Sequence, residues 1–260
     1  MDKFYFKKSM GQNFLKDDNI INKIIKNSDI DSDTLVIEIG PGSGNLSTKI
    51  VPLCGYAILY ELDERLHDIL YERLSSYSNY RIVFGDFLKQ KIENLPELDS
   101  YKKVYVVANL PYYITTSIIT KLLYEIYPDK IVVMVQDEVA DRLSANYGSK
   151  NYSMITALIA SRYDVKKIFK VSRKCFIPMP NVDSAIIEMN KNDGIDNIDF
   201  VKLDKFLKDA FKYKRKTLRN NLKNYDLEVI SGTLSKFNFS LYNRAEEIPV
   251  EVFIDIIRHI

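Results

Sequence analysis

Four consecutive residues, Asn109-Leu110-Pro111-Tyr112, combine hydrogen-bond acceptors, a rigid turn and an aromatic ring. The side-chain oxygen of Asn109 and the backbone carbonyl of Leu110 can each accept a hydrogen from an amine, and Pro111 restricts the turn. Such acceptors direct the lone pair of an adenine exocyclic amine, which is otherwise delocalised into the ring, toward an electrophile. A base can also stack on the Tyr112 ring. The motif therefore predicts group transfer to the amine of an adenine.

Three further positions are typical of a nucleoside cofactor site. Gly40 and Gly42 belong to a Gly-x-Gly-x-Gly run that ends at Gly44, and this spacing departs from the Gly-x-Gly-x-x-Gly of pyrophosphate-binding folds. Glu61 follows where a carboxylate can accept hydrogen bonds from both ribose hydroxyls. Asp86 can accept from the amine of an adenine ring, although Gly-Asp is also common in turns. Together they predict S-adenosylmethionine rather than NAD or ATP.

Alternating strands and helices are predicted to position these residues. Apolar, β-branched runs indicate strands at 34–39, 57–62, 81–84, 103–107 and 131–135, and helical spacing appears at 20–25, 46–51 and 66–74. This alternation predicts βαβ units and a parallel sheet covered on both faces. Because ligands of such sheets bind beyond the carboxyl ends of the strands, residues 40, 61, 86 and 109 should meet at one edge.

The pattern changes after Met189. Two more strands, 165–171 and 184–189, flank a Pro-rich loop, and a polar break at 190–194 follows them. Beyond the break, helical spacing appears at 200–207, 218–222 and 252–257. We therefore predict a catalytic, cofactor-binding domain over residues 1–190 and a small helical domain over residues 191–260.

Composition excludes several classes of chemistry. Cys54 and Cys175 are far apart, with no Cys-x-x-Cys spacing and no nearby histidine, so we expect neither a disulfide framework nor a metal site. His67 and His259 lie outside any motif, which argues against a histidine base. The start lacks a signal-peptide pattern, and no run approaches ~18 apolar residues. These features predict a cytoplasmic protein without a membrane span.

Several segments together match the motifs of one known family. They are Gly11 to Leu15, Glu38 to Gly44, Glu61 to Asp63, Gly85-Asp86, Asn109 to Tyr112, Phe176 to Ser184 and Lys214 to Leu222. Over nearly the whole chain, the sequence resembles the ribosomal RNA adenine dimethyltransferases, a family that also includes resistance-conferring methylases of large-subunit RNA. The resemblance implies an α/β fold, with the seven-stranded Rossmann-like sheet of class I methyltransferases, an antiparallel last strand and a small all-helical C-terminal domain.

The resemblance also assigns site residues. It implies that the cofactor is lined by Asn13, Leu15, Gly40, Glu61, Asp86 and Asn109, the first two of which the residues alone would place in an ordinary helix. It places Phe176 opposite Tyr112, so that the two rings would sandwich the target adenine. From the residues alone, an aromatic before Pro-x-Pro is more often loop packing.

Two motifs resemble the housekeeping small-subunit enzyme more than the resistance methylases. They are the Lys214 to Leu222 stretch and the Phe176 to Ser184 loop. That enzyme dimethylates the exocyclic N6 amine of two adjacent adenines in the 3′-terminal hairpin loop of 16S small-subunit RNA, a step linked to ribosome biogenesis. The resemblance implies this activity, with a pre-30S-like particle as partner, and we expect a monomer. The alternatives are a large-subunit methylase conferring macrolide-type resistance and a non-catalytic nucleic-acid-binding or assembly factor on the same fold.

A basic run is the expected RNA-binding surface. Between Phe211 and Lys223 the chain has no acid and carries Lys212, Lys214, Arg215, Lys216, Arg219 and Lys223. We predict that these side chains contact RNA phosphates, although such a run can also be a solvated helix face. Lys3, Lys7 and Lys8 are expected to add to this surface, and both segments to flank the mouth of the site.

Overall fold

The computed structural model describes residues 12–192 and 198–260. These residues form two compact units. The first contains the chain up to Ala140 together with Lys166–Asn190, and the second contains Asp141–Val165 and Lys191–Ile260. In the described part of the chain, no helix is long and apolar enough to cross a membrane.

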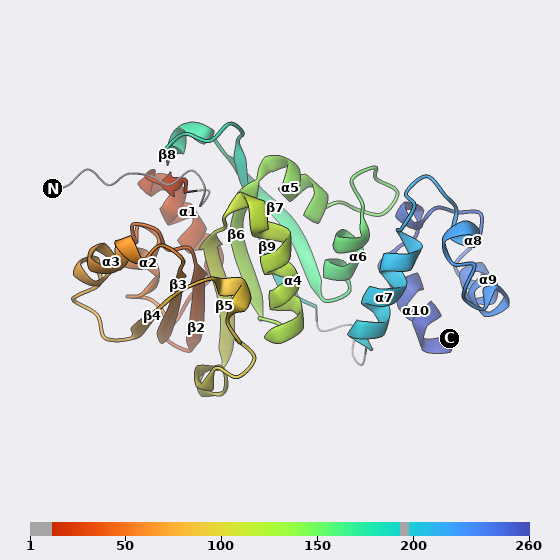
Figure 1. Cartoon of the computed structure of the whole chain (residues 1–260), viewed down its shortest axis with the longest axis horizontal. Coiled ribbons are helices and arrows are strands. Elements are labelled where there is room, and N and C mark those ends of the chain that lie inside the picture. Colours follow the sequence, from red (N-terminus) through yellow and green to blue (C-terminus); the bar gives the residue numbers. More distant parts are fainter. Residues whose placement is uncertain (1–11, 193–197) are drawn as a thin grey trace. The chain divides into compact units, whose positions relative to one another are not determined.

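A seven-stranded sheet forms the centre of the first unit (Figure 1). In spatial order its strands are β4 (Tyr80–Phe84), β3 (Tyr56–Glu61), β2 (Thr34–Ile39), β5 (Lys103–Asn109), β6 (Lys130–Gln136), β9 (Ser184–Lys191) and β7 (Tyr163–Val171). The strands from β4 to β6 pair in parallel, whereas β9 pairs antiparallel with β6. The predicted α/β fold with its antiparallel last strand is therefore confirmed.

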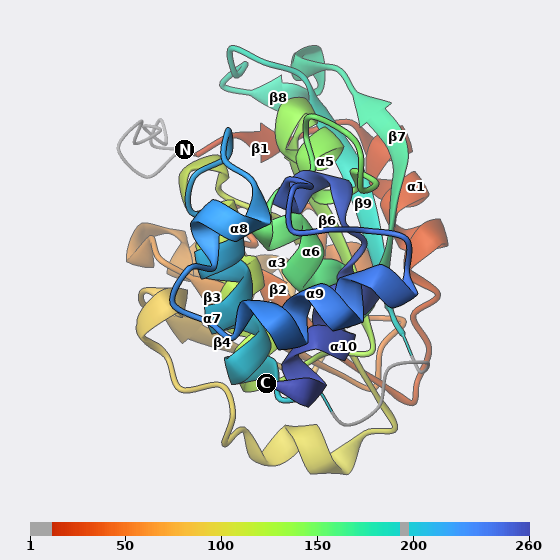
Figure 2. The same ribbon diagram turned by 90° about the vertical axis from the view of Figure 1, so that its right-hand side faces the viewer.

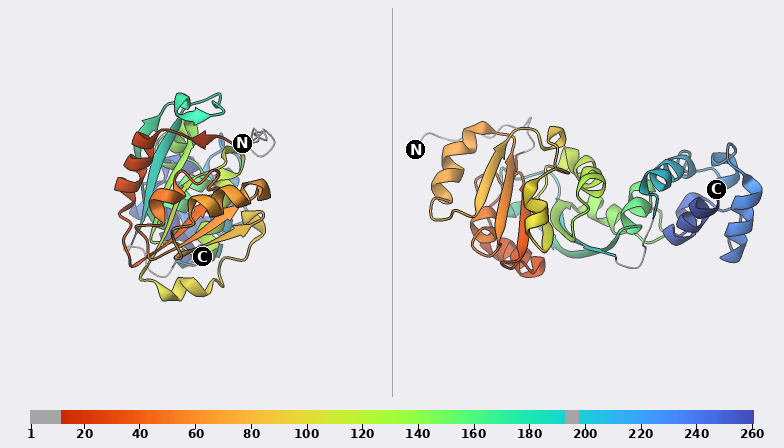
Figure 3. Two further views of the ribbon diagram at one scale, coloured as in Figure 1. Left: turned by 90° about the vertical axis from the view of Figure 1, so that its left-hand side faces the viewer. Right: turned by 90° about the horizontal axis from the view of Figure 1, so that it is seen from below.

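Helices cover both faces of this sheet. They are α1 (Asp18–Ser28), α2 (Ser47–Ile50), α3 (His67–Arg73), α4 (Thr115–Glu125) and the start of α5 (Asp137–Leu143). The Asp17 side chain caps α1, because it accepts hydrogen bonds from the backbone N–H groups of Asn19 and Ile20. Helices α1 and α4 lie on opposite faces (Figures 1 and 3). Neither α4 nor α5 was predicted from the sequence.

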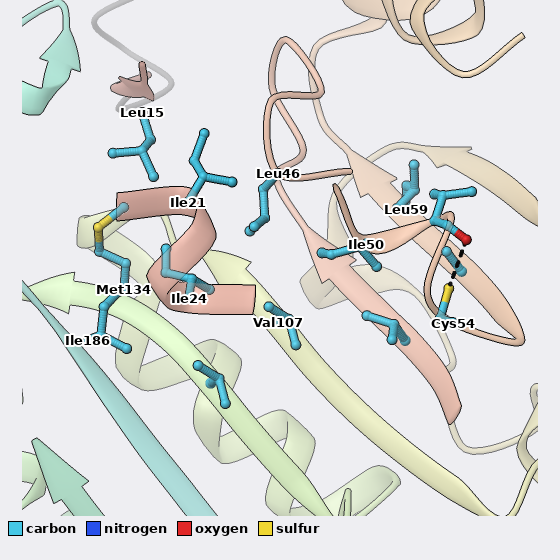
Figure 4. Packing of buried hydrophobic residues seen from close by; sticks show 14 of the residues in the cluster. Leu15, Ile21, Ile24, Leu46, Ile50, Cys54, Leu59, Val107, Met134 and Ile186 are labelled. Carbon is cyan, nitrogen blue, oxygen red and sulfur yellow. Dashed lines mark hydrogen bonds between the residues drawn. The ribbon is translucent and has the colours of Figure 1, made fainter. Parts of the chain in front are cut away.

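The central strands are nearly continuous apolar runs because both of their faces are buried, as the core beneath α1 shows. Ile21 and Ile24 of α1 pack with Val107 of β5 and Met134 of β6, each at most 1% exposed (Figure 4). Their strand neighbours point to the other face, where Val106 is equally buried beneath the second layer of helices. Both faces of each central strand are therefore withdrawn from water.

A two-stranded ribbon joins the N-terminal segment to the Pro-rich loop. Strand β1 (Phe14–Leu15) pairs antiparallel with β8 (Phe176–Ile177), and the Lys16 N–H donates to the Cys175 carbonyl at 2.9 Å. Figure 2 shows these two strands together. The pairing joins residues about 160 positions apart in the sequence, so local patterns could not predict it.

Helices make up most of the second unit, which also contains the first residues of β7 and the last residue of β9. They are α6 (Met154–Ala160), α7 (Phe200–Ala210), α8 (Leu218–Asn221), α9 (Leu227–Lys236) and α10 (Val250–His259). Helix α10 packs on α9 and α7, and α6 packs on α7 (Figure 2). The division differs from the predicted boundary because the buried side of α6 packs with C-terminal helices, which groups residues 141–165 with this unit.

Candidate active site

A pocket at the carboxyl edge of the sheet gathers most of the predicted site residues. Its lining includes Asn13, Gly40, Gly42, Glu61, Asp86, Asn109, Leu110, Pro111 and Tyr112. They come from the N-terminal segment and from the ends of β2, β3, β4 and β5, which run parallel and therefore end at the same edge. Leu15 and Phe176 do not line this pocket.

Glu61 is held in place by backbone donors. Its side chain accepts hydrogen bonds from the Gly42 N–H at 2.9 Å and from the Asp63 N–H at 2.8 Å, one on each carboxylate oxygen. The residue is 6% exposed, and this burial raises the pKa of its carboxyl. Each oxygen keeps a second lone pair. The carboxylate can therefore accept hydrogen bonds from two neighbouring hydroxyl groups.

The glycine turn packs closely against the N-terminal segment. Gly40 and Gly42 have φ values of +74° and +59°, in the left-handed region that disfavours other residues. A Cβ atom at Gly42 would lie 2.7 Å from the Phe14 ring. The turn and the N-terminal segment are thus in close contact, and a side chain at position 42 would push them apart.

A buried carboxyl group lies behind this turn. Glu38 is 1% exposed and accepts a hydrogen bond from the Ser47 hydroxyl at 2.6 Å. Burial raises its pKa from 4.5 to about 8, and repulsion by Glu61 acts in the same direction. Glu38 is therefore largely protonated at neutral pH and adds little negative charge beneath the pocket.

Asp86 ends β4 and closes the far side of the pocket. Its Oδ1 accepts a hydrogen bond from the Leu88 N–H at 3.0 Å and so caps the short turn Phe87–Lys89. The side chain is 36% exposed, and Oδ2 lies 4.0 Å from the ammonium group of Lys89. A carboxylate held by one oxygen in this way has acceptor capacity left for a ligand amine.

The amide of Asn109 has a defined orientation. Its Nδ2 donates to the backbone carbonyl of Asn13 at 2.9 Å, and a carbonyl can only accept, so this contact identifies which amide atom is nitrogen. Oδ1 is then the atom left to accept a hydrogen from a ligand. The following Leu110 is 1% exposed, and its N–H donates to the Met134 carbonyl at 3.2 Å. The motif is thus anchored on both sides.

Tyr112 lines the pocket with its ring and is tethered at its hydroxyl. The hydroxyl oxygen lies 2.6 Å from the Ser184 hydroxyl, at the start of β9. Burial raises the pKa of Tyr112, so the phenol stays neutral at physiological pH. A ring fixed at both ends is a suitable platform for a stacked base.

The N-terminal segment Gln12–Lys16 lies across these strand ends. The Gln12 amide donates to Asp63 at 2.7 Å, and the Asn45 amide donates to the Leu15 carbonyl at 2.7 Å. Asp63 is 3% exposed, and its hydrogen bonds from Arg65 hold its pKa at about 2. The Leu15 side chain packs into the core and borders a smaller hollow beside the turn. Gly11 and the lysines at positions 3, 7 and 8 lie outside the described residues.

Phe176 is buried instead of facing Tyr112. It is 2% exposed and belongs to the same apolar cluster as Leu15 and Met134. Phe176 is the cross-strand partner of Leu15, and opposed residues of an antiparallel pair point to the same face. The β1–β8 pairing therefore directs this ring into the core, and the expected sandwich is not formed in this structure.

The six residues of the basic run are all exposed in the second unit. Five of them lie in the connections before and after α8, and Arg219 lies within α8, so the run does not form one face of a helix. The Lys214 ammonium group donates to the Lys150 carbonyl at 2.8 Å. The run therefore presents six solvent-accessible cations, while Leu218 and Leu222 between them are buried.

Several pocket residues were not predicted. Gln12 and Phe14 come from the N-terminal segment, Leu62 and Phe87 immediately follow predicted strand-end positions, and Tyr113 follows the Asn109–Tyr112 motif. Their proximity to those strand ends was the available signal, because any side chain directly after a parallel strand stands near the same edge.

Comparison with known proteins identifies the family. The ribosomal RNA adenine dimethylase family matches residues 3–260. The chain is 39% identical to a ribosomal RNA small subunit methyltransferase A of Mycoplasma mobile over 251 residues, covering 95% of each chain. It is 40% identical to the protein of that name from Staphylococcus aureus, covering 96% of this chain and 88% of the relative.

Solved structures agree with this assignment. A dimethyladenosine transferase from Plasmodium falciparum superposes with a TM-score of 0.78 at 28% identity, covering 94% of this chain and 95% of the other. The 23S rRNA methyltransferase ErmE gives a TM-score of 0.77 at 24% identity, with 95% and 99% covered, which shows a shared fold. The chain therefore belongs to the ribosomal RNA adenine dimethylase family and is a methyltransferase that uses S-adenosylmethionine.

Proposed function

We propose that this protein dimethylates the N6 amines of two adjacent adenines in the 3′-terminal hairpin loop of small-subunit ribosomal RNA. The observation that carries the proposal is the oriented Asn109 amide, whose acceptor oxygen remains available in a pocket that also contains the buried Glu61 carboxylate. Methyl transfer to adenine requires a group that activates the target amine and a carboxylate that binds the nucleoside part of the cofactor, and this pocket contains both.

The pocket residues fit S-adenosylmethionine. Glu61 can accept hydrogen bonds from the two ribose hydroxyls, and Asp86 can accept a hydrogen bond from the amine of the cofactor's adenine. Gly40 and Gly42 line the pocket with backbone and no side chain, and Asn13 adds a polar group from the N-terminal segment. When bound, the cofactor supplies a methyl group on a sulfonium centre.

Asn109 and Leu110 prepare the target amine. Hydrogen bonds from the amine to the Asn109 Oδ1 and to the Leu110 carbonyl withdraw its lone pair from the ring and aim it at the methyl donor. Tyr112 holds the extruded base by stacking. After the first transfer the amine keeps one hydrogen, so a single acceptor must then suffice for the second.

The relatives support small-subunit RNA as the substrate. Those at 39% and 40% identity are named for the small subunit, whereas the large-subunit enzyme is similar at 24% and shares the fold. The intact motif and pocket favour catalysis over a purely structural assembly role. Within this proposal the enzyme acts as a monomer, in the cytoplasm, on a pre-30S-like particle whose RNA phosphates contact the basic run.

The test is mass analysis of RNA from unmethylated small subunits and, in parallel, from unmethylated large subunits, each incubated with the protein and labelled cofactor. We expect two adjacent dimethyladenosines in the 3′-terminal hairpin loop, and none with the Asn109→Ala variant. Methylation of large-subunit RNA alone, or of neither RNA, would overturn the proposal.

A further inference from the structure

A polar hollow lies next to the platform formed by Tyr112. In the pairing of β6 with β9, Gln136 is directly opposite Ser184, and the Ser184 hydroxyl is bonded to the Tyr112 hydroxyl at 2.6 Å. Opposed residues of an antiparallel pair point to the same face, with Cβ atoms about 4.5–5.5 Å apart. The Gln136 side chain is therefore separated from the Tyr112 hydroxyl by a single serine.

Gln136 opens onto a hollow distinct from the cofactor pocket. Its lining also includes Asp137, Glu138, Lys170, Arg173, Asn181, Val182 and Asp183, and none of these residues lines the first pocket. Within residues 12–192 and 198–260, the amide of Gln136 has no hydrogen-bond partner. It is half-buried, so its donor and acceptor atoms are available to a ligand in the hollow.

The charges around the hollow are partly compensated from within. Asp137 lies 2.7 Å from the Lys167 ammonium group and 2.9 Å from that of Lys170, and these cations lower its pKa. Asp183 accepts a hydrogen bond from the Arg173 N–H at 3.0 Å. Glu138 is exposed on the rim. Asp137 therefore forms an ion pair that positions Lys170, and Asp183 forms a hydrogen bond that positions the Arg173 backbone.

We propose that this hollow binds the nucleotide next to the target adenosine in the RNA strand. The inference rests on the proposed function, in which the target base stacks on Tyr112 and its neighbour in sequence is another adenine. The hollow begins on the other side of the Tyr112–Ser184 contact, so it lies beside the ring on which the target base stacks.

The side chains of the hollow match an adenine nucleotide. A glutamine amide pairs with adenine through two hydrogen bonds, accepting from N6 and donating to N7. The guanidinium of Arg173 donates to the Asn181 carbonyl at 3.0 Å, and its remaining N–H groups can contact a phosphate, while Val182, 44% exposed, offers an apolar contact. Gln136 is thus a specificity residue for the neighbour and lies outside the group that activates the target amine.

The test compares small subunits in which one of the two adjacent adenines, each in turn, is replaced by uracil. Single-turnover dimethylation of the remaining adenine is measured against subunits that carry both. We expect the wild-type enzyme to prefer an adenine neighbour by roughly 5- to 150-fold, the range for one two-bond base contact, on at least one side. In Gln136→Ala this preference should fall to within about twofold.

Comparing enzymes on the same RNAs cancels any effect of the uracil on the hairpin itself. Gln136→Glu, which keeps the side-chain length but removes the donor to N7, should lose the same preference. Gln90→Ala is the matched control, because Gln90 is a half-buried glutamine that lines neither pocket, and it should keep the wild-type ratio. Thermal unfolding and cofactor affinity of each variant confirm an intact fold and site.

An unchanged preference in Gln136→Ala would overturn the inference, as would a wild-type enzyme that is indifferent to the neighbour while still methylating its target. Failure of the wild-type enzyme to methylate subunits that carry both adenines would instead overturn the proposed function. The two failures are therefore distinguishable.

Discussion

Replacing Asn109 with aspartate separates the two tasks of this side chain. In the structure its Nδ2 donates to the Asn13 carbonyl, while Oδ1 is left for the target amine. Asn109→Asp keeps acceptor oxygens but has no donor, so two acceptors would face each other. Losing a neutral hydrogen bond costs about 0.5–1.5 kcal/mol, and leaving a partly buried carbonyl unpaired costs about 1–3 kcal/mol. We assign roughly 1–3 kcal/mol to the docking of the N-terminal segment.

This cost should appear in cofactor binding more than in chemistry. Because Asn13 and the segment Gln12–Lys16 border the cofactor pocket, undocking them should weaken S-adenosylmethionine binding by roughly 5- to 150-fold. At saturating cofactor, Asn109→Asp should methylate faster than Asn109→Ala, because only the aspartate still presents an acceptor to the amine.

Calorimetry with S-adenosylmethionine and single-turnover kinetics with saturating RNA measure the two effects separately. Asn45→Ala is the matched control. It removes the hydrogen bond to the Leu15 carbonyl but no acceptor near the base, so it should lower cofactor affinity and leave the saturated rate unchanged. Parental cofactor affinity in a folded Asn109→Asp variant would refute the reasoning, since the Asn13 contact would then contribute nothing to the pocket.

Three further substitutions test the buried groups and the basic run. Phe176→Leu should lower the free energy of unfolding by about 1–2 kcal/mol in urea titrations and leave the rate of single-turnover methylation near that of the parent. A large loss of rate without loss of stability would show instead that the Phe176 ring stacks on the target adenine. The pKa of Glu38, raised to about 8, means that the folded protein retains a proton that the unfolded chain releases above pH 4.5. Stability should therefore fall as pH rises from about 4.5 to about 8, by at most about 1.4 kcal/mol per pH unit, and Glu38→Gln should flatten this slope in urea titrations across that range. An identical slope in both proteins would contradict the assignment. Neutralising Lys214, Arg215 and Lys216 should weaken RNA binding and reduce its salt slope, each lost phosphate contact removing about 0.7–0.9, with cofactor affinity unchanged; an unaltered slope would identify a merely solvated segment.

The cofactor side of the site was predictable from local sequence. Strand periodicity located β2, β3, β4 and β5, and parallel strands connected by helices must end at a common edge. Gly40, Glu61, Asp86 and Asn109 each stand at such an end, so their meeting in one pocket followed from their positions in the chain.

Contacts between distant segments were not predictable in this way. The β1–β8 pairing places the Phe176 ring in the hydrophobic core. The sequence of the Pro-rich loop does not by itself distinguish a buried ring from one that stacks on a base. The Asn13 carbonyl that orients the Asn109 amide lies 96 residues away. A backbone carbonyl carries no residue-type signal, so its partner is known only when both segments are placed.

The sequence by itself therefore determined the chemistry of the motif, the α/β class and the strand-end positions, because these depend on residue type and local periodicity. Only the tertiary structure decided which neighbours surround each side chain. Antiparallel register set Gln136 beside Ser184 and Phe176 opposite Leu15, and packing on α7 placed α6 with the C-terminal helices. Such choices follow from the burial of whole surfaces, whose free energy is shared among residues far apart in the chain.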